Sequence, residues 1–259
     1  MILHVPHSSK VIPPDFQNQF LISPEDLSHE LLCMTDAYTD ELFALSEATM
    51  LVFPYSRLVC DVERFLSPMD ESMMLKGMGM YYTHSHDLKP LKKSPFETID
   101  GLFHYGMALR LYQKHHRKFS KLVQKELDTY GKCLILDIHS FPNHALPYED
   151  SSLLRPALCL GTDKDFSYHY RGNHSEEFLD FVRLYFSTFP LKENLPFSGS
   201  IVPEPFYSNK DYHVCSIMLE INRSLYMDEL KGEKLTDFPY LQAYFSSFVS
   251  RAVDMFYHS

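Results

Sequence analysis

Cys133-Leu-Ile-Leu-Asp-Ile-His139, closed by Ser140-Phe-Pro142, is the stretch that decides the fold. A run rich in Leu and Ile, preceded by Tyr130-Gly131 and stopped by a proline, predicts a strand buried on both faces in the middle of a sheet. Asp137 and His139 lie two residues apart, so on a strand they point to the same side. They come at the carboxyl end, where open α/β sheets bind their ligands. His139 is therefore a candidate catalytic or metal-binding residue.

Length and composition favour one soluble domain over residues 1–259. Hydrophobic residues make up 45% of the chain, and no shift in composition divides it into halves. The formal net charge of -10 argues against nucleic acid or an anionic membrane surface as a partner, since both need a basic patch. The five cysteines are widely spaced, which is typical of small core residues in a reducing cytoplasm.

The location and assembly of the protein follow less directly. No apolar segment approaches the length of a membrane helix, and the first residues lead directly into a strand-like pattern. We therefore expect a soluble, cytoplasmic protein. The net charge leaves room for a small-molecule substrate that is anionic, provided that arginines gather locally. The sequence leaves the oligomeric state open.

The order of the remaining elements predicts an α/β protein, a single domain with a mixed, twisted sheet flanked by helices. Further strands are expected at residues 2–6, 48–55, 157–161 and 216–223. Helices are expected at residues 26–34, 35–46, 176–189 and 241–257, with Thr35-Asp36 as the N-cap signal of the second, and residues 96–128 are expected to form one long helix or two. Residues 57–65 read as an extended segment, and residues 67–95 as a long irregular insertion that covers a site.

Three of the predicted strands end in groups that a buried sheet would not choose without a reason. They are Val5-Pro-His7-Ser, Leu136-Asp-Ile-His139-Ser and Met218-Leu-Glu220-Ile-Asn222-Arg223. Two histidines and carboxylates in one crevice suit a zinc hydrolase, whose metal needs about three protein ligands and an open position for water. A single histidine after a strand is more often structural, but Glu220 within an apolar strand is costly to bury unless it is paired or functional. The remaining histidines show no ligand spacing beyond chance.

Five segments, taken together and in order, resemble the N-formylglutamate amidohydrolase family over about residues 4–228. They are His4-Val-Pro-His7-Ser, Ser56-Arg57-Leu-Val-Cys-Asp61-Val-Glu63-Arg64-Phe, Leu136-Asp-Ile-His139-Ser-Phe-Pro, Pro196-Phe-Ser198-Gly199 and Leu219-Glu220-Ile-Asn222-Arg223-Ser-Leu-Tyr226-Met. The resemblance implies a zinc-carboxypeptidase-like (phosphorylase/hydrolase-like) fold and a bound zinc ion. It also implies hydrolysis of the N-acyl amide of a small acidic amino acid, such as N-formylglutamate.

The resemblance implies that His7 and His139 are the two histidine ligands of the zinc ion. Zinc carboxypeptidases carry a glutamate ligand three residues after the first histidine, but here that position is Lys10, which cannot serve. Asp36 is the expected replacement, and Asp61 is the alternative.

The resemblance also implies a general base and a set of arginines. Glu220 is expected to take a proton from the metal-activated water and pass it to the leaving amine. Arg57 is expected to polarise the scissile carbonyl and Arg64 to hold the substrate carboxylate, because guanidinium groups bind carboxylates bidentately. Glu63 stands where many members have Asn. Further substrate contacts are expected from Arg223, Asn222 and Ser198.

Two alternatives stay open. One is a zinc hydrolase on the same scaffold that acts on another N-acyl amino acid or a peptide. The other is a non-catalytic protein that holds a carboxylate ligand in the same crevice. Asp137, on the same face as His139, is expected to orient a histidine.

Overall fold

The computed structural model describes residues 1–259 except 68, 153, 163–174, 207–212 and 259. A six-stranded sheet runs through its centre in the order β2-β1-β3-β6-β4-β5. Four strands are parallel to one another: β2 (Thr49–Val52), β1 (Ile2–Val5), β3 (Cys133–Phe141) and β6 (Val214–Asn222). β4 (Leu158–Gly161) runs antiparallel to β6, and β5 (Leu191–Glu193) runs parallel to β4. The expected α/β fold with a mixed sheet is confirmed, and the 133–139 run lies in its middle.

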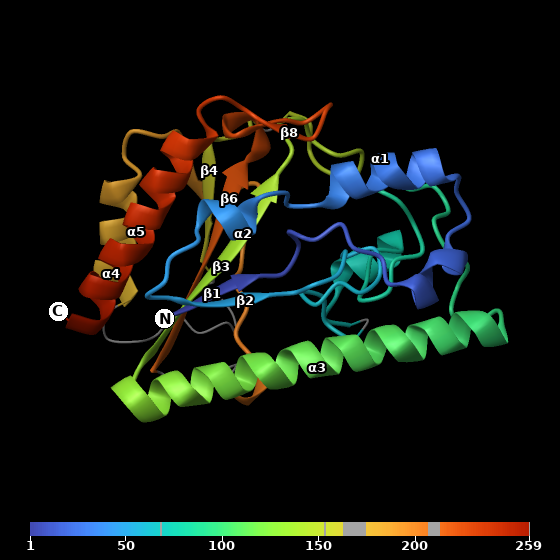
Figure 1. Ribbon diagram of the computed structural model, residues 1–259, viewed down its shortest axis with the longest axis horizontal. Helices are drawn as coiled ribbons and strands as arrows, with labels where there is room; N and C mark the ends of the chain where they lie inside the picture. The colour runs from blue at the N-terminus through green and yellow to red at the C-terminus, as the bar shows by residue number, and fades with distance from the viewer. Residues whose placement is uncertain (68, 153, 163–174, 207–212, 259) are drawn as a thin grey trace.

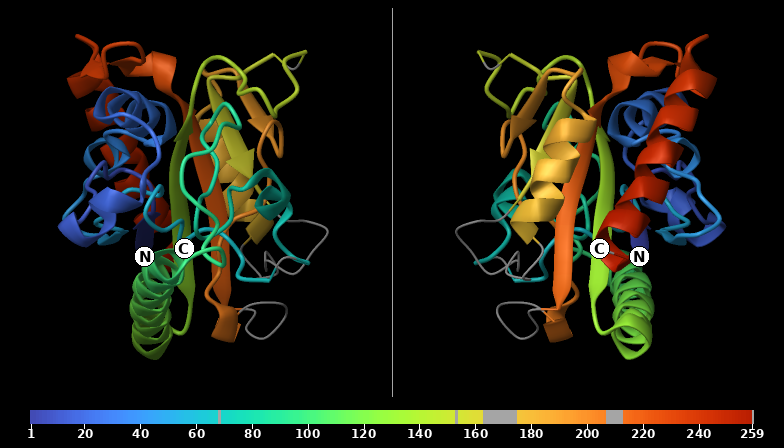
Figure 2. Two further views of the ribbon diagram at one scale, coloured as in Figure 1. Left: turned by 90° about the vertical axis from the view of Figure 1, so that its right-hand side faces the viewer. Right: turned by 90° about the vertical axis from the view of Figure 1, so that its left-hand side faces the viewer.

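Helices cover both faces of this sheet (Figure 1). α5 (Phe238–His258), α4 (Ser175–Tyr185) and the short α2 (Thr39–Leu42) pack on one face, and α3 (Ile99–Tyr130) packs on the other. The right-hand view of Figure 2 shows α4 and α5 in front of the sheet. α1 (Pro24–Met34) lies apart from them, at the end of the molecule that also holds the irregular insertion.

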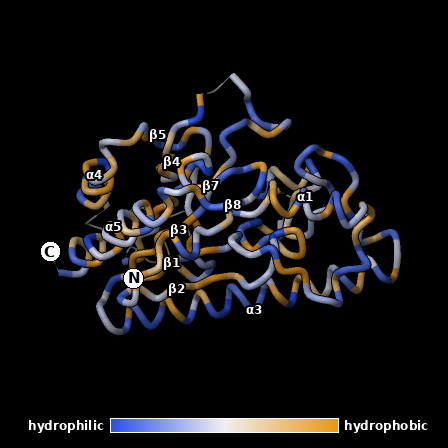
Figure 3. Tube along the Cα trace, turned by 45° about the horizontal axis from the view of Figure 1, so that its top comes forward, coloured by the Kyte–Doolittle hydropathy of each residue, from blue (hydrophilic) through white to orange (hydrophobic). Residues whose placement is uncertain are grey.

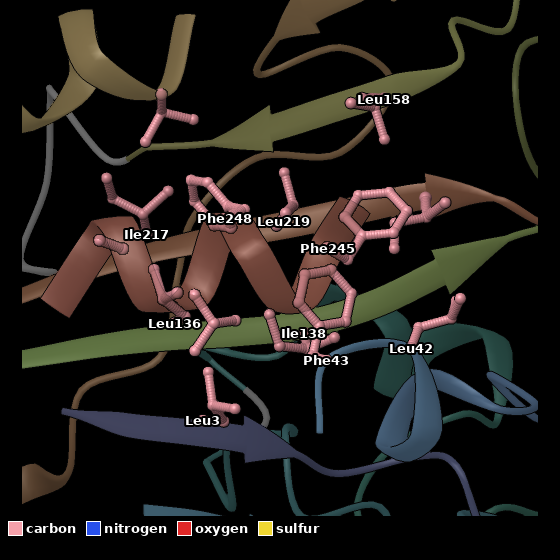
Figure 4. Packing of buried hydrophobic residues seen from close by; sticks show 14 of the residues in the cluster. Leu3, Leu42, Phe43, Leu136, Ile138, Leu158, Ile217, Leu219, Phe245 and Phe248 are labelled. Atoms are coloured by element: carbon pink, nitrogen blue, oxygen red, sulfur yellow. The ribbon is translucent and has the colours of Figure 1, made fainter. Parts of the chain in front are cut away.

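Alternation along β3 decides which side chains face which layer. Leu134, Leu136 and Ile138 join the core under α5, and Figure 4 shows Leu136 and Ile138 beside Phe245 and Phe248 of that helix. Cys133 and Ile135 pack against α3 instead. Asp137 and His139 have the same parity as these two, so they lie on the α3 side of the sheet.

The helical pattern over residues 96–128, expected to form one long helix or two, forms the single helix α3. It begins at Thr98, whose side chain accepts from the Gly101 amide, and it ends at Gly131 with a φ of 70°. Its buried positions follow a four-residue spacing at His115, Phe119 and Val123, and Figure 3 shows the mixed hydropathy of a helix with one exposed face.

Two local predictions were wrong. The helix expected at 35–46 is reduced to α2, because the Asp36 carboxylate is buried against His139 and Arg223 and does not cap a helix. Residues 57–65 form turns instead of an extended segment, since the Asp61 carboxylate accepts from the Glu63 amide and curls the chain.

The remaining elements are short. They are the 3-10 helices η1 (Pro14–Gln19), η2 (Ser72–Lys76), η3 (Glu204–Phe206) and η4 (Arg223–Leu225), and the hairpin of β7 (Met227–Asp228) and β8 (Glu233–Lys234). η2 is the only named element among the described residues of the 67–95 insertion, which is irregular as expected. None of the described helices is long and apolar enough to cross a membrane.

Candidate active site

A cavity of about 1520 Å³ opens where the central strands end. His7 follows β1, His139 lies near the end of β3, and Glu220 pairs with His139 across β3 and β6. Eight of the nine predicted site residues line this cavity: His7, Asp36, Arg57, Arg64, His139, Ser198, Glu220 and Arg223. The structure therefore brings together residues that lie up to 216 positions apart.

His7, Asp36 and His139 form a buried cluster. Oδ2 of Asp36 lies 3.2 Å from Nδ1 of His139 and 3.6 Å from Nδ1 of His7. Each histidine is held through its other nitrogen, because Nε2 of His7 donates to Asp61 at 2.8 Å and Nε2 of His139 donates to Asp137 at 3.1 Å. A carboxylate partner on the far nitrogen is the usual way in which proteins orient a metal-binding histidine.

The donor set of this cluster fits a zinc ion. Nδ1 of His7 is buried and has no hydrogen-bond partner among the described residues. Zinc–nitrogen distances of about 2.0–2.1 Å place two ligand atoms of a tetrahedral site about 3.4 Å apart, which lies between the two distances from Asp36. Two imidazoles and one carboxylate leave the fourth position of a tetrahedral ion open. Of the two candidates for the third ligand, Asp36 lies near Nδ1 of both histidines, whereas Asp61 accepts from the opposite nitrogen of His7 alone.

Electrostatics keep the Asp36 carboxylate ionised. Burial alone would raise its pKa, but the neighbouring His139 and His7 imidazoles and the charge of Arg223 hold the pKa of Asp36 well below its usual range. An ionised, buried carboxylate between two imidazoles is ready to bind a cation.

Arg223, which is expected to contact the substrate, lies on the cavity lining and binds Asp36. Its Nη2 donates to Asp36 at 2.9 Å and to the Ser140 carbonyl, its Nε donates to the Ser140 hydroxyl, and its Nη1 donates to the Cys33 carbonyl. These contacts use four of the five N–H groups of a guanidinium. Arg223 is a positioning residue for Asp36.

Glu220 lies buried on β6 beside His139. Its Oε2 has no hydrogen-bond partner among the described residues. Burial raises the pKa of Glu220 to about 8, against the opposing charge of His139. A carboxylate with a pKa near neutrality can take and return a proton under physiological conditions.

Arg57 and Arg64 reach the cavity from the turns that follow β2. Nε and Nη2 of Arg57 donate to Asp61 at 3.1 and 2.7 Å, and Nε of Arg64 lies 3.4 Å from the same carboxylate. The pKa of Asp61 is held well below its usual range, because Arg57, His7 and Arg64 together outweigh its burial. Asp61 thus fixes one histidine and both arginines at once.

Asn222, which is expected to contact the substrate, makes its described hydrogen bonds with other groups of the protein. It lies outside the lining of the cavity, and its side chain caps η4 by accepting from the Ser224 amide and hydroxyl. Its amide nitrogen donates to Asn143 and to the Pro156 carbonyl. These hydrogen bonds give Asn222 a structural role at the end of β6. Ser198, the other predicted substrate contact with a small polar side chain, is exposed and lies on the cavity lining.

Sequence reasoning missed a buried chain of polar groups beneath the cluster. Nε2 of His115 lies 2.8 Å from Nε2 of His4, and Nδ1 of His4 lies 2.9 Å from Asp137, the expected orienting group of His139. Hydrogen bonds to Asp137 and Glu63 outweigh burial and raise the pKa of His4 to about 9. The four-residue spacing of His115 from Phe119 would have revealed it as a core histidine.

Arg155 is a second residue that the sequence did not single out. Its guanidinium lies beside the rings of Phe141 and Phe197, at 5.4 and 5.5 Å from their centres, and pairs with Glu149. Its Nη1 is buried without a hydrogen-bond partner among the described residues. Arg155 therefore presents an unsatisfied cationic donor on the cavity lining.

A sheet that brings histidines, an aspartate and a buried glutamate to one crevice is typical of α/β hydrolases that act on a small substrate. The chain belongs to the N-formylglutamate amidohydrolase family, whose sequence profile matches residues 1–227. It is thus a member of a family of amidohydrolases.

Solved structures share the fold at low sequence identity. The crystal structure of N-formylglutamate amidohydrolase from Ralstonia eutropha JMP134 superposes with a TM-score of 0.77 at 18% identity, over 98% of this chain and 92% of that one. A gene product of Agrobacterium tumefaciens gives a TM-score of 0.56 at 17% identity, over 97% and 90%. No curated protein sequence matches the chain significantly.

Proposed function

We propose that this protein is a zinc-dependent amidohydrolase that cleaves the N-acyl amide of a small acidic amino acid such as N-formylglutamate. The observation that carries the proposal is the meeting of Nδ1 of His7, Nδ1 of His139 and Oδ2 of Asp36 beside the buried Glu220. Membership of an amidohydrolase family supports the reaction class.

His7, Asp36 and His139 would hold the zinc ion. A zinc ion at such a site supplies a Lewis acid and lowers the pKa of water to about 7. Asp61 and Asp137 keep the two imidazoles in the tautomer whose Nδ1 is free to bind, because each accepts the N–H of Nε2. Arg223 holds Asp36 in place through its Oδ1 oxygen.

Glu220 is the proposed general base. Its unpartnered Oε2 accepts the proton of the attacking water, and the raised pKa lets it hold that proton and then pass it to the nitrogen of the leaving amine. Arg57 has Nη1 left for the scissile carbonyl, since Nε and Nη2 are bound to Asp61.

Two arginines are available for the substrate carboxylate. Arg64 is the expected one, and the unsatisfied Nη1 of Arg155 offers a second donor on the same lining. The Glu63 carboxylate lies 3.0 Å from Nδ1 of His4, whose positive charge balances it, so an anionic substrate is not repelled there. The departure from Asn at Glu63 is compatible with an acidic substrate.

The first experiment is elemental analysis of protein purified without chelator. We expect one equivalent of zinc or a similar ion at the His7–Asp36–His139 cluster. The His139→Ala variant should lose this equivalent. Protein that holds no metal and gains no activity from added zinc would contradict the proposal.

Glu220→Gln tests the base separately. We expect the variant to lose at least about 100-fold in kcat, the usual scale for general-base catalysis, while its bound zinc stays unchanged. Glu233→Gln, an exposed change on β8, is the matched control and should retain both. Unchanged turnover in Glu220→Gln would remove Glu220 as the base.

A substrate panel separates this proposal from its alternatives. N-formyl and N-acetyl derivatives of glutamate and aspartate should be cleaved faster than dipeptides, with a KM that rises in Arg64→Met. Preferred cleavage of dipeptides would indicate a peptidase on the same scaffold. Binding of these compounds without turnover in the zinc-loaded protein would indicate a carboxylate-binding protein.

A further inference from the structure

Three metal-binding side chains meet outside the His7–Asp36–His139 cluster. His29 and Cys33 lie one turn apart on α1, with 3.5 Å between Nε2 and Sγ, and His86 comes from the irregular insertion. One ligand atom of each residue lies within 4.8 Å of the other two. α1 and the insertion lie together at the right of Figure 1, on the far side from α4 and α5.

The spacing of this group fits a tetrahedral ion. Zinc–nitrogen and zinc–sulfur distances of about 2.05 and 2.3 Å place the two ligand atoms about 3.6 Å apart, close to the distance found between His29 and Cys33. A four-residue spacing on a helix is also one that lets two side chains bind the same ion.

His86 is held in the way that metal-binding histidines usually are. The Glu30 carboxylate, 3% exposed, accepts from the backbone N–H of His86 at 2.7 Å and from its Nδ1 at 2.5 Å. This leaves Nε2 of His86 as the nitrogen available for an ion. Glu30 itself is buried and in contact with His86, so its negative charge would lie near an ion bound by that histidine.

We propose that His29, Cys33 and His86 form a second metal site, which takes a zinc-like transition-metal ion and ties the insertion to α1. One thiolate and two imidazoles select such an ion over magnesium or calcium, which prefer oxygen ligands. The site leaves one position open to water, and two of its three side chains are only partly buried, so an ion can enter from solvent. The Cys33 carbonyl accepts from Arg223, and a fixed Cys33 therefore steadies the residue that holds Asp36.

Cobalt substitution tests this site apart from the catalytic one. The catalytic cluster has no sulfur ligand, so thiolate-to-cobalt charge-transfer absorption reports Cys33 alone, and the four other cysteines are buried. We expect the full-length protein, stripped of metal and loaded with Co²⁺, to bind two equivalents and to show this absorption. Cys33→Ser and His29→Ala should each lose the absorption and one equivalent.

Two control variants make the result specific. His84→Ala removes a histidine from the same insertion outside the group and should keep both equivalents and the absorption. His139→Ala should lose the catalytic equivalent and keep the absorption, so failure of the proposed function and failure of this site are distinguishable. A wild-type protein without charge-transfer absorption, or a His29→Ala variant that retains it in full, would overturn the second site.

Discussion

Asp61 joins His7 of the proposed metal site to Arg57 of the proposed catalytic site, and Asp61→Asn is the most informative single change. Its Oδ1 accepts from Nε2 of His7 at 2.8 Å and from the Glu63 amide at 3.0 Å. Its Oδ2 accepts from Nε and Nη2 of Arg57 and from the Tyr82 hydroxyl at 2.8 Å. All five partners are donors. An asparagine amide nitrogen cannot accept a hydrogen bond. In either orientation of the side-chain amide in Asp61→Asn, this nitrogen would therefore face the donors that one carboxylate oxygen of Asp61 now binds.

The loss can be estimated from burial. Asp61 is fully buried, and Arg57 is 14% exposed at its side chain. Removing one partner of such a pair leaves an uncompensated charge and costs about 3–5 kcal/mol, a large part of the roughly 5–15 kcal/mol that stabilises a domain. Loss of the carboxylate that orients His7 should also weaken zinc binding by about 10- to 100-fold.

The two effects are measured separately. Urea unfolding in the presence of chelator gives the stability of the metal-free protein, and competition with a chelating dye gives the zinc affinity. Asp128→Asn, an exposed change on α3, is the control and should stay within about 0.5 kcal/mol of wild type. An Asp61→Asn protein that unfolds like wild type and binds zinc as tightly would refute the role of Asp61 as a buried anchor.

Three further results are expected. Arg223→Met should weaken zinc binding by about 10- to 100-fold because Asp36 loses its guanidinium partner, and Arg223→Lys should not restore it; tight binding in both would contradict the positioning role. Burial lowers the pKa of the Lys92 ammonium to about 7, so between about pH 7 and pH 10 the unfolded chain binds more protons than the folded one. The free energy of unfolding of wild type should therefore rise with pH across this window more than that of Lys92→Met. Parallel stability profiles would argue against a buried lysine that titrates near neutrality. Phe245→Ala should lower the free energy of unfolding by about 3–5 kcal/mol, because its ring is fully buried with its centre 4.8 Å from that of Phe43. A loss below about 1 kcal/mol would show that the core under α5 closes the space left by the missing ring.

The sequence by itself determined the sheet and the ends of its central strands. An apolar run such as 133–141 can be satisfied only by burial on both faces, so its place in the middle of the sheet follows from local pattern alone. Polar groups at the ends of three such strands are then forced to one edge, which is why His7, His139 and Glu220 were predicted to share a crevice and do line one.

Only the tertiary structure decided how the polar groups pair. Asp36 lies 103 positions from His139 and 187 from Arg223, and nothing in the local pattern distinguishes it from Asp61, which accepts from the opposite nitrogen of His7. The motif around Asn222 looks like a binding site but caps η4, because the chain turns there. The apolar periodicity of a segment indicates which of its side chains are buried. It does not indicate which group pairs with a buried polar side chain, because any partner of the right polarity can do so. Which partner does so depends on the path of the whole chain, since a buried polar group pairs with whatever the packed elements bring within about 3 Å.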